Sequence, residues 1–155
     1  MNIFMTSPDP AACAVMMDDR RLIKMVLETA QLLSSAYRLQ GMGEQWCYKL
    51  THQNHPCAVW TRDSRANLNW LAAHGIELAN EYAYRFGRRH KSLDVILACK
   101  QQGSFLSYPE TGYRFDCSGQ AVGNVFDNYQ ACMRAKWQDD GLLARWTKRN
   151  PPSWR

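Results

Sequence analysis

The stretch "RRLIKMVLETAQLLSSAY" (residues 20–37) decides the fold class, because its apolar residues recur at intervals of three and four. This repeat predicts one long amphipathic helix. Asp18 or Asp19 supplies the carboxylate that suits an N-cap, so the helix is expected to run for about 18–20 residues and to reach Arg38.

A narrow polar stripe runs along this helix. At a repeat of about 3.6 residues per turn, one face carries Arg20 or Arg21, then Lys24, Glu28, Gln31 and Ser35. We expect the rest of the helix to be buried through Leu22, Ile23, Met25, Val26, Leu27, Ala30, Leu32 and Leu33. The stripe is either the solvated edge of the helix or the polar floor of a groove. A cation one turn from a single glutamate favours the groove, because it sets an anion-binding group beside a potential general base.

A second helical region follows two loops. The segment "CYKLTHQNHP" (residues 47–56) ends at Pro56, a residue that suits the first turn of a helix. Apolar residues at intervals of three and four then predict helix to about Phe86, with a break near Ser64 or Gly75.

The remaining elements are shorter or less regular. Gly87 suits a helix C-cap, and a helix is expected over about 92–102. Residues 103–119 are expected to form either an open loop or a short hairpin. Ser118 is the expected N-cap of a last long helix, which reaches about Trp137.

Length and charge limit the class of protein. A chain of 155 residues suits one domain, so residues 1–155 are expected to form a compact, mainly α fold with long loops. Nineteen Lys and Arg against 14 Asp and Glu give a net charge of +5, which favours an anionic partner, with nucleic acid the leading candidate. No apolar stretch approaches the roughly 18 residues of a membrane span, so no membrane partner is expected.

A polar cluster precedes the second helical region. The segment "YKLTHQNHPC" (residues 48–57) carries Lys49, His52, Asn54 and His55 near a helix N-terminus, where backbone N–H groups favour phosphate. Two other interpretations stay open. The histidines can cap the loop, or they can bind zinc together with Cys57, although the spacing matches no established zinc pattern.

Basic residues recur along the rest of the chain, interleaved with aromatic residues in a way that suits nucleic acid. The candidates for phosphate contact are Arg62, Arg65, Arg85, Arg88, Arg89, Lys91, Lys148 and Arg149.

Several motifs together resemble a family of short phage proteins related to endonuclease V, the phage pyrimidine-dimer DNA glycosylase. They are "KMVLETAQLLS", "YKLTHQNHPCAVW", "SRANLNWL", "EYAYRFGRRHKS" and "RWTKRNPPSW". In addition, "LNWLAAHGIELANEY" is similar to the middle helix of the glycosylase, and Glu28 matches its catalytic glutamate. The resemblance implies a compact helical fold that grips double-stranded DNA with a nucleotide flipped out. It also implies action without a cofactor in the cytoplasm of an infected bacterial host.

The chain departs from the glycosylase at its start. The glycosylase attacks the sugar with an α-amine that is exposed when its initiator methionine is removed before a small residue, whereas here Met1 precedes Asn2. A Met1 amine that forms an imine remains the nucleophile in one alternative, a pyrimidine-dimer DNA glycosylase and AP lyase.

The leading hypothesis is a transferase of thymidine hypermodification, in which a free amino acid displaces phosphate from phosphorylated 5-hydroxymethyluracil in DNA. Arg20, Arg21 and Lys24 would stabilise the departing phosphate, and Glu28 would take a proton from the incoming ammonium. The orienting histidine would be His52 or His55. Further substrate or phosphate contacts are expected from Gln31, Lys49, Asn54, Arg62 and Arg65, and contacts to the DNA backbone from Arg88, Arg89, Lys91, Lys148 and Arg149. A third alternative is a non-catalytic DNA-binding module.

Overall fold

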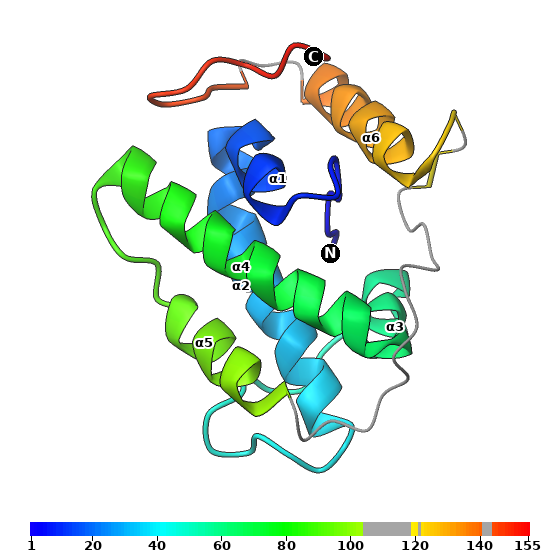
Figure 1. Cartoon of the computed structure of the whole chain (residues 1–155), viewed down its shortest axis with the longest axis vertical. Helices are drawn as coiled ribbons and strands as arrows, with labels where there is room; N and C mark the ends of the chain where they lie inside the picture. The colour runs from blue at the N-terminus through cyan, green and yellow to red at the C-terminus, as the bar shows by residue number, and fades with distance from the viewer. Residues whose placement is uncertain (104–118, 121, 141–143) are drawn as a thin grey trace.

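The computed structural model describes residues 1–103, 119–120, 122–140 and 144–155. These residues form six α-helices and no β-strand, which confirms the mainly α fold class. The helices are α1 (Pro10–Met16), α2 (Asp19–Arg38), α3 (Pro56–Asp63), α4 (Arg65–Phe86), α5 (Leu93–Gln102) and α6 (Val125–Asp139), arranged as in Figure 1.

The two long helices α2 and α4 form the centre of the fold and cross each other (Figure 1). Gly75 of α4 lies at a close approach, because a Cβ atom there would meet Thr29 Cγ2 at 2.6 Å and Ile96 Cδ1 at 3.1 Å. Of the two positions expected for a break between helices, the structure has it at Ser64. The Ser64 hydroxyl accepts a hydrogen bond from Asn67 N at 3.1 Å. Gly75 therefore serves helix packing and leaves α4 continuous.

Helix α2 begins as the sequence predicts. Asp18 is its N-cap and accepts a hydrogen bond from Arg21 N at 3.1 Å. The expected burial was wrong for Ile23 and Leu27, which are 42% and 41% exposed. A helical repeat identifies an apolar arc but does not say how much of that arc neighbouring segments cover.

The start of α6 and the presence of α1 differ from what the sequence predicts. Helix α6 begins at Val125 and not after Ser118, because the Asn124 side chain accepts hydrogen bonds from the first backbone N–H groups of the helix. Ser118 and most of the expected loop or hairpin at 103–119 lie outside the described residues. Helix α1 was not expected at all, since seven residues are too few to display a helical repeat.

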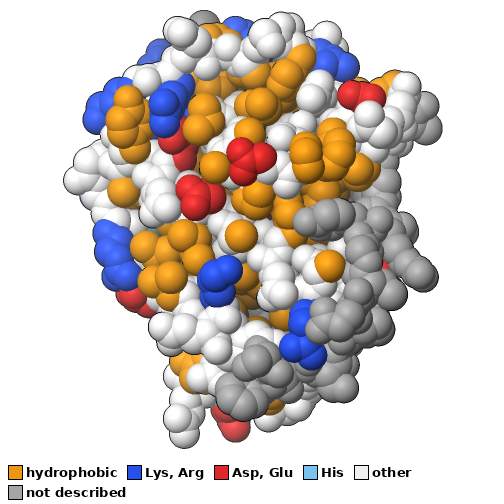
Figure 2. Space-filling view, in the orientation of Figure 1, with side chains coloured by type: hydrophobic (Ala, Val, Ile, Leu, Met, Phe, Trp, Pro, Cys, Tyr) orange, Lys and Arg blue, Asp and Glu red, His pale blue; other side chains and the backbone are white. Residues whose placement is uncertain are grey.

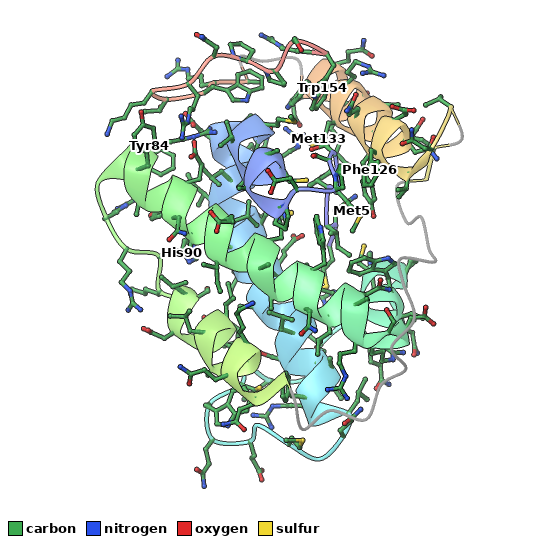
Figure 3. All side chains as sticks on the ribbon, viewed as in Figure 1. Met5, Tyr84, His90, Phe126, Met133 and Trp154 are labelled. Carbon is green, nitrogen blue, oxygen red and sulfur yellow. The ribbon has the colours of Figure 1, made fainter. Side chains whose placement is uncertain are left out.

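The N-terminal segment is part of the core. Ile3, Phe4 and Met5 are each at most 3% exposed, and Figure 3 shows Met5 beneath α6 in that view. Trp70 of α4 donates a hydrogen bond to Pro8 O at 2.9 Å, and Gln130 of α6 donates one to Thr6 O at 3.1 Å. The start of the chain is therefore held in place from two sides.

A buried arginine joins three helices. Arg85 of α4, expected as a phosphate contact, is only 2% exposed, so that expectation was wrong. Its guanidinium binds Glu81 Oε1 at 2.7 Å, Asp19 Oδ1 at 3.0 Å, and two backbone carbonyls at the end of α1. Arg149 of the C-terminal segment binds the same Glu81 carboxylate with two hydrogen bonds of 2.9 Å. The cluster thereby fixes the first turn of α2 against α4 and α1.

Acid should destabilise the fold through His74, a fully buried residue whose Nδ1 lies 3.2 Å from Pro10 O. Burial lowers the pKa of His74 to about 4. The unfolded chain binds this proton near pH 6.5, so the free energy of unfolding should fall as the pH drops from about 6.5 to about 4, by at most ~1.4 kcal/mol per pH unit. Denaturant titrations across this range should show a shallower pH dependence for His74→Phe.

The matched control is His52→Asn, because His52 is exposed. That variant should keep the pH dependence of the wild type. An unchanged slope in His74→Phe would show that another group governs stability in this range.

Candidate active site

A pocket of about 230 Å³ opens over the first half of α2. Three segments line it: the N-terminal residues, α2 and the end of α6. Its charged residues are Arg20, Arg21, Lys24, Glu28, Lys136 and Asp140. Basic side chains outnumber carboxylates here, so the pocket suits an anionic group. Its two carboxylates, Glu28 and Asp140, remain able to accept a proton or bind a cation.

Glu28 is the most enclosed carboxylate of the pocket, with 6% of its surface exposed. Its Oε1 atom lies 3.2 Å from Lys24 Nζ. Its Oε2 atom accepts a hydrogen bond from Asn2 N at 3.0 Å and lies 4.0 Å from the Met1 amine. A buried charge is tolerated only where such partners compensate it. Lys24 and the Met1 amine carry positive charge, and the Asn2 N–H donates a hydrogen bond.

A tight turn folds the N-terminus onto Glu28. The Asn2 side chain accepts hydrogen bonds from Ile3 N at 2.7 Å and Phe4 N at 3.0 Å. Phe4 has a φ of 53°, a left-handed conformation that costs a bulky residue about 1–3 kcal/mol. Burial of the Phe4 ring holds this conformation, and the turn presents the Met1 amine to the pocket.

The three cations expected to bind the phosphate, Arg20, Arg21 and Lys24, differ in how freely their side chains can move. Arg21 is largely buried and binds Asp18 Oδ2 at 2.9 Å and Asp140 Oδ2 at 2.7 Å. The side chains of Lys24 and Arg20 are 67% and 79% exposed. Lys24 and Arg20 can therefore move toward a bound anion, whereas Arg21 serves mainly to shape the wall of the pocket.

Neither expected histidine lines the pocket. His52 is exposed, has a φ of 46° and hydrogen-bonds the neighbouring Thr51 hydroxyl. His55 is the N-cap of α3 and accepts from Cys57 N at 3.1 Å. Burial lowers the pKa of His55, the charges of the N-terminal amine and His52 lower it further, and Glu28 opposes them.

Five other candidates lie away from this pocket. Arg62 donates to Gln53 O at 2.7 Å and Arg65 to Gly103 O at 3.5 Å, so both support neighbouring loops. Lys49 and Asn54 are exposed, and Gln31 is half-buried. No group of three or more His, Cys, Asp or Glu in the described part of the chain is arranged to hold a metal ion.

The residues expected at the DNA backbone fall into two places. Arg88, Arg89 and Lys91 follow α4 and are exposed, and Arg89 pairs with Asp94. Lys148 donates to Tyr84 O at 2.8 Å, and Figure 3 shows Tyr84 at the end of α4 below the C-terminal segment. In Figure 2 the Lys and Arg side chains of the visible face stand in several separate places and not in one continuous patch.

Three contributors to the pocket were missed from the sequence. They are the Asn2 backbone N–H, Lys136 and Asp140. No local pattern marks them, since each reaches the pocket through the folding of segments far from α2. The Met1 amine was a candidate from the sequence, because the resemblance to the glycosylase pointed to the N-terminal amine as a nucleophile.

A family model described as pyrimidine dimer DNA glycosylase matches residues 1–94. The chain belongs to this family. The match includes α1 to α4 and the Met1, Lys24 and Glu28 side of the pocket, while α6 and the C-terminal segment lie beyond it. Comparisons with curated proteins and with solved structures gave no match.

Family membership makes this chain an enzyme of a DNA-acting family and favours that class over a non-catalytic binding module. None of the described helices combines the length and the apolar character that crossing a membrane requires.

The dependence of DNA affinity on salt should reveal which cations meet phosphate. Arg88 and Lys91 have no carboxylate partner among the described residues, whereas Arg149 is held by Glu81. Each phosphate contact contributes about 0.9 to the log–log slope of affinity against salt. We expect the double variant Arg88→Ala/Lys91→Ala to reduce that slope by up to about 2 in fluorescence anisotropy titrations with duplex DNA.

Lys100→Ala, an exposed lysine at the end of α5, is the control and should leave the slope nearly unchanged. A wild-type slope in the double variant would exclude this surface from the interface.

Proposed function

We propose that this protein modifies a flipped pyrimidine nucleotide in double-stranded DNA by transferring an amino acid to a phosphorylated 5-hydroxymethyluracil base. One observation carries the proposal: an enclosed carboxylate, Glu28, stands beside the Met1 amine on one side and the exposed Lys24 ammonium on the other. Amine transfer with loss of phosphate needs both a proton acceptor and a site for the departing anion.

The reaction assigns a separate task to each group. Glu28 takes one proton from the ammonium of the amino acid, which frees the nitrogen lone pair. The nitrogen then bonds to the methylene carbon of the base as the bond from that carbon to the phosphate oxygen breaks. The departing phosphate receives the proton that Glu28 accepted, so charge and atoms balance. Lys24 and Arg20 can follow the phosphate, because both side chains are mostly exposed.

The local geometry around Glu28 supports its role as an amine-facing base. Its Oε2 atom is already held by the N-terminal segment, whereas among the ion pairs of the described residues Oε1 meets only the exposed Lys24 side chain. An incoming ammonium would approach Oε1 while Lys24 turns to the phosphate. This movement of Lys24 from Glu28 to the phosphate would couple binding of the amine to binding of the anion.

Two substitutions test the transfer. Duplex DNA containing 5-phosphomethyluracil would be incubated with single amino acids, and the nucleosides analysed by mass spectrometry. Glu28→Gln should reduce turnover by about 100-fold or more through loss of the base. Lys24→Met should reduce it by a comparable factor through loss of a charge-stabilising donor, with duplex affinity largely retained.

The matched controls are Glu77→Gln on α4 and Lys100→Met on α5, which lie outside this pocket. Both should turn over like the wild type. Near-full activity in Glu28→Gln and Lys24→Met would move the reaction to another site.

A second candidate is a pyrimidine-dimer DNA glycosylase and AP lyase, which the position of the Met1 amine favours. The nitrogen lies 4.0 Å from Glu28 Oε2, and Met1 and Glu28 both belong to the family-matched segment. A deprotonated α-amine can attack the sugar carbon to form an imine. Glu28 would then stabilise the developing positive charge.

Borohydride trapping on duplex DNA with an abasic site separates the two chemistries. The lyase should form a covalent crosslink, because borohydride reduces the imine between the amine and the sugar. An extra residue placed before Met1 should abolish the crosslink by displacing the amine. The transferase should give no crosslink but should form the amino acid adduct, so a crosslink without an adduct would make the lyase the function.

A further inference from the structure

We infer that the end of α6 completes a subsite for a free α-amino acid in this pocket, with Asp140 receiving its ammonium and Lys136 receiving its carboxylate. The inference rests on the proposed transferase function and adds residues beyond the segment that the family model matches.

Helix α6 is fixed firmly enough to contribute to a binding site. Asp140 Oδ2 binds the largely buried Arg21 at 2.7 Å, and Trp137 Nε1 donates to Asp18 Oδ2 at 2.8 Å. Both contacts reach the first turn of α2, the helix that carries Glu28. Lys136 and Asp140 therefore keep a defined position relative to the proposed base.

The two oxygens of Asp140 have different surroundings. Oδ2 is occupied by Arg21, whereas the ion pair that Oδ1 makes within the described part of the chain is a 3.4 Å contact to Arg20, an arginine whose side chain is 79% exposed. The hydrogen bond from Arg21 lowers the pKa of Asp140, with further contributions from Arg20 and Lys136, so the carboxylate stays ionised at neutral pH. Oδ1 can therefore accept an ammonium when Arg20 turns to another anion.

A second carboxylate is unexpected in a pocket that serves only DNA, because it repels phosphate. It becomes useful when the ligand carries a positive charge. An α-amino acid carries an ammonium and a carboxylate on adjacent positions, and the pocket sets Asp140 beside Lys136 and Arg20. Asp140 first holds the ammonium near Glu28, and Glu28 then takes the proton.

The pocket is open to solvent on one side, so its volume of about 230 Å³ sets no upper limit on the side chain of the amino acid. Glycine carries both charges and no side chain, and it is therefore the probe that tests the two charged contacts alone.

Binding of glycine to the full chain, measured by saturation-transfer NMR with unmodified duplex DNA present, tests the subsite without any reaction. Methylamine and acetate, which each keep one of the two charges, should bind more weakly than glycine. Lys136→Met and Asp140→Asn should each raise the Kd for glycine by about tenfold or more, since each removes a charge-assisted hydrogen bond. Asp140→Asn keeps an oxygen that can accept from Arg21, which guards against loss of the fold.

The controls are Asp139→Asn, which changes the adjacent exposed aspartate of α6, and Lys100→Met. Both should bind glycine like the wild type. Equal Kd values in all four variants, or no binding of any small amino acid to the wild type, would overturn the subsite.

The turnover assay distinguishes the subsite from the proposed function. If adducts form and Lys136→Met leaves the KM for the amino acid unchanged, the subsite is wrong and the transferase stands. If glycine binding depends on Lys136 and Asp140 but no adduct forms on the phosphorylated duplex, the subsite stands and the transferase proposal fails. A higher KM with an unchanged kcat in Lys136→Met supports both.

Discussion

The buried Arg85 guanidinium is the contact on which the arrangement of α1, α2 and α4 depends. It reaches from α4 to the last carbonyls of α1 and to Asp19 at the start of α2, with no exposed side-chain surface. Breaking one partner of such a buried pair typically costs about 3–5 kcal/mol, because the remaining charge is left uncompensated. Arg149 reinforces the cluster through Glu81 and thereby secures the C-terminal segment.

The geometry of the pocket depends on this cluster of Arg85, Glu81, Asp19 and Arg149. Fixing Asp19 sets the rotation of α2, and that rotation turns Lys24 and Glu28 toward the N-terminal segment. Glu28 is then enclosed by donors from the folded start of the chain, while Asp140 approaches from α6. A rigid frame of this kind holds catalytic groups close to their working positions, and only the exposed Lys24 and Arg20 side chains remain free to move.

Much of the helical framework could be predicted because it depends on contacts within a few residues. The Asp18 cap, the break at Ser64 and the Gly87 cap each follow from local backbone needs. The start of α6 was missed because Ser118 and Asn124 are both preferred N-cap residues, and sequence alone does not rank them. Short α1 was missed although Asp9 caps it and Pro10 occupies its first turn, because seven residues are too few to display a helical repeat.

The sequence by itself determined that α2 forms and that Lys24 lies one turn from Glu28, since an i to i+4 pair is a property of the helix alone. Only the tertiary structure decided that Glu28 is enclosed while Ile23 and Leu27 stay exposed. It also decided that Arg85 is buried, and that the Met1 amine and Asp140 reach the pocket. The physical reason is distance along the chain: these contacts join segments whose meeting depends on the packing of every helix between them.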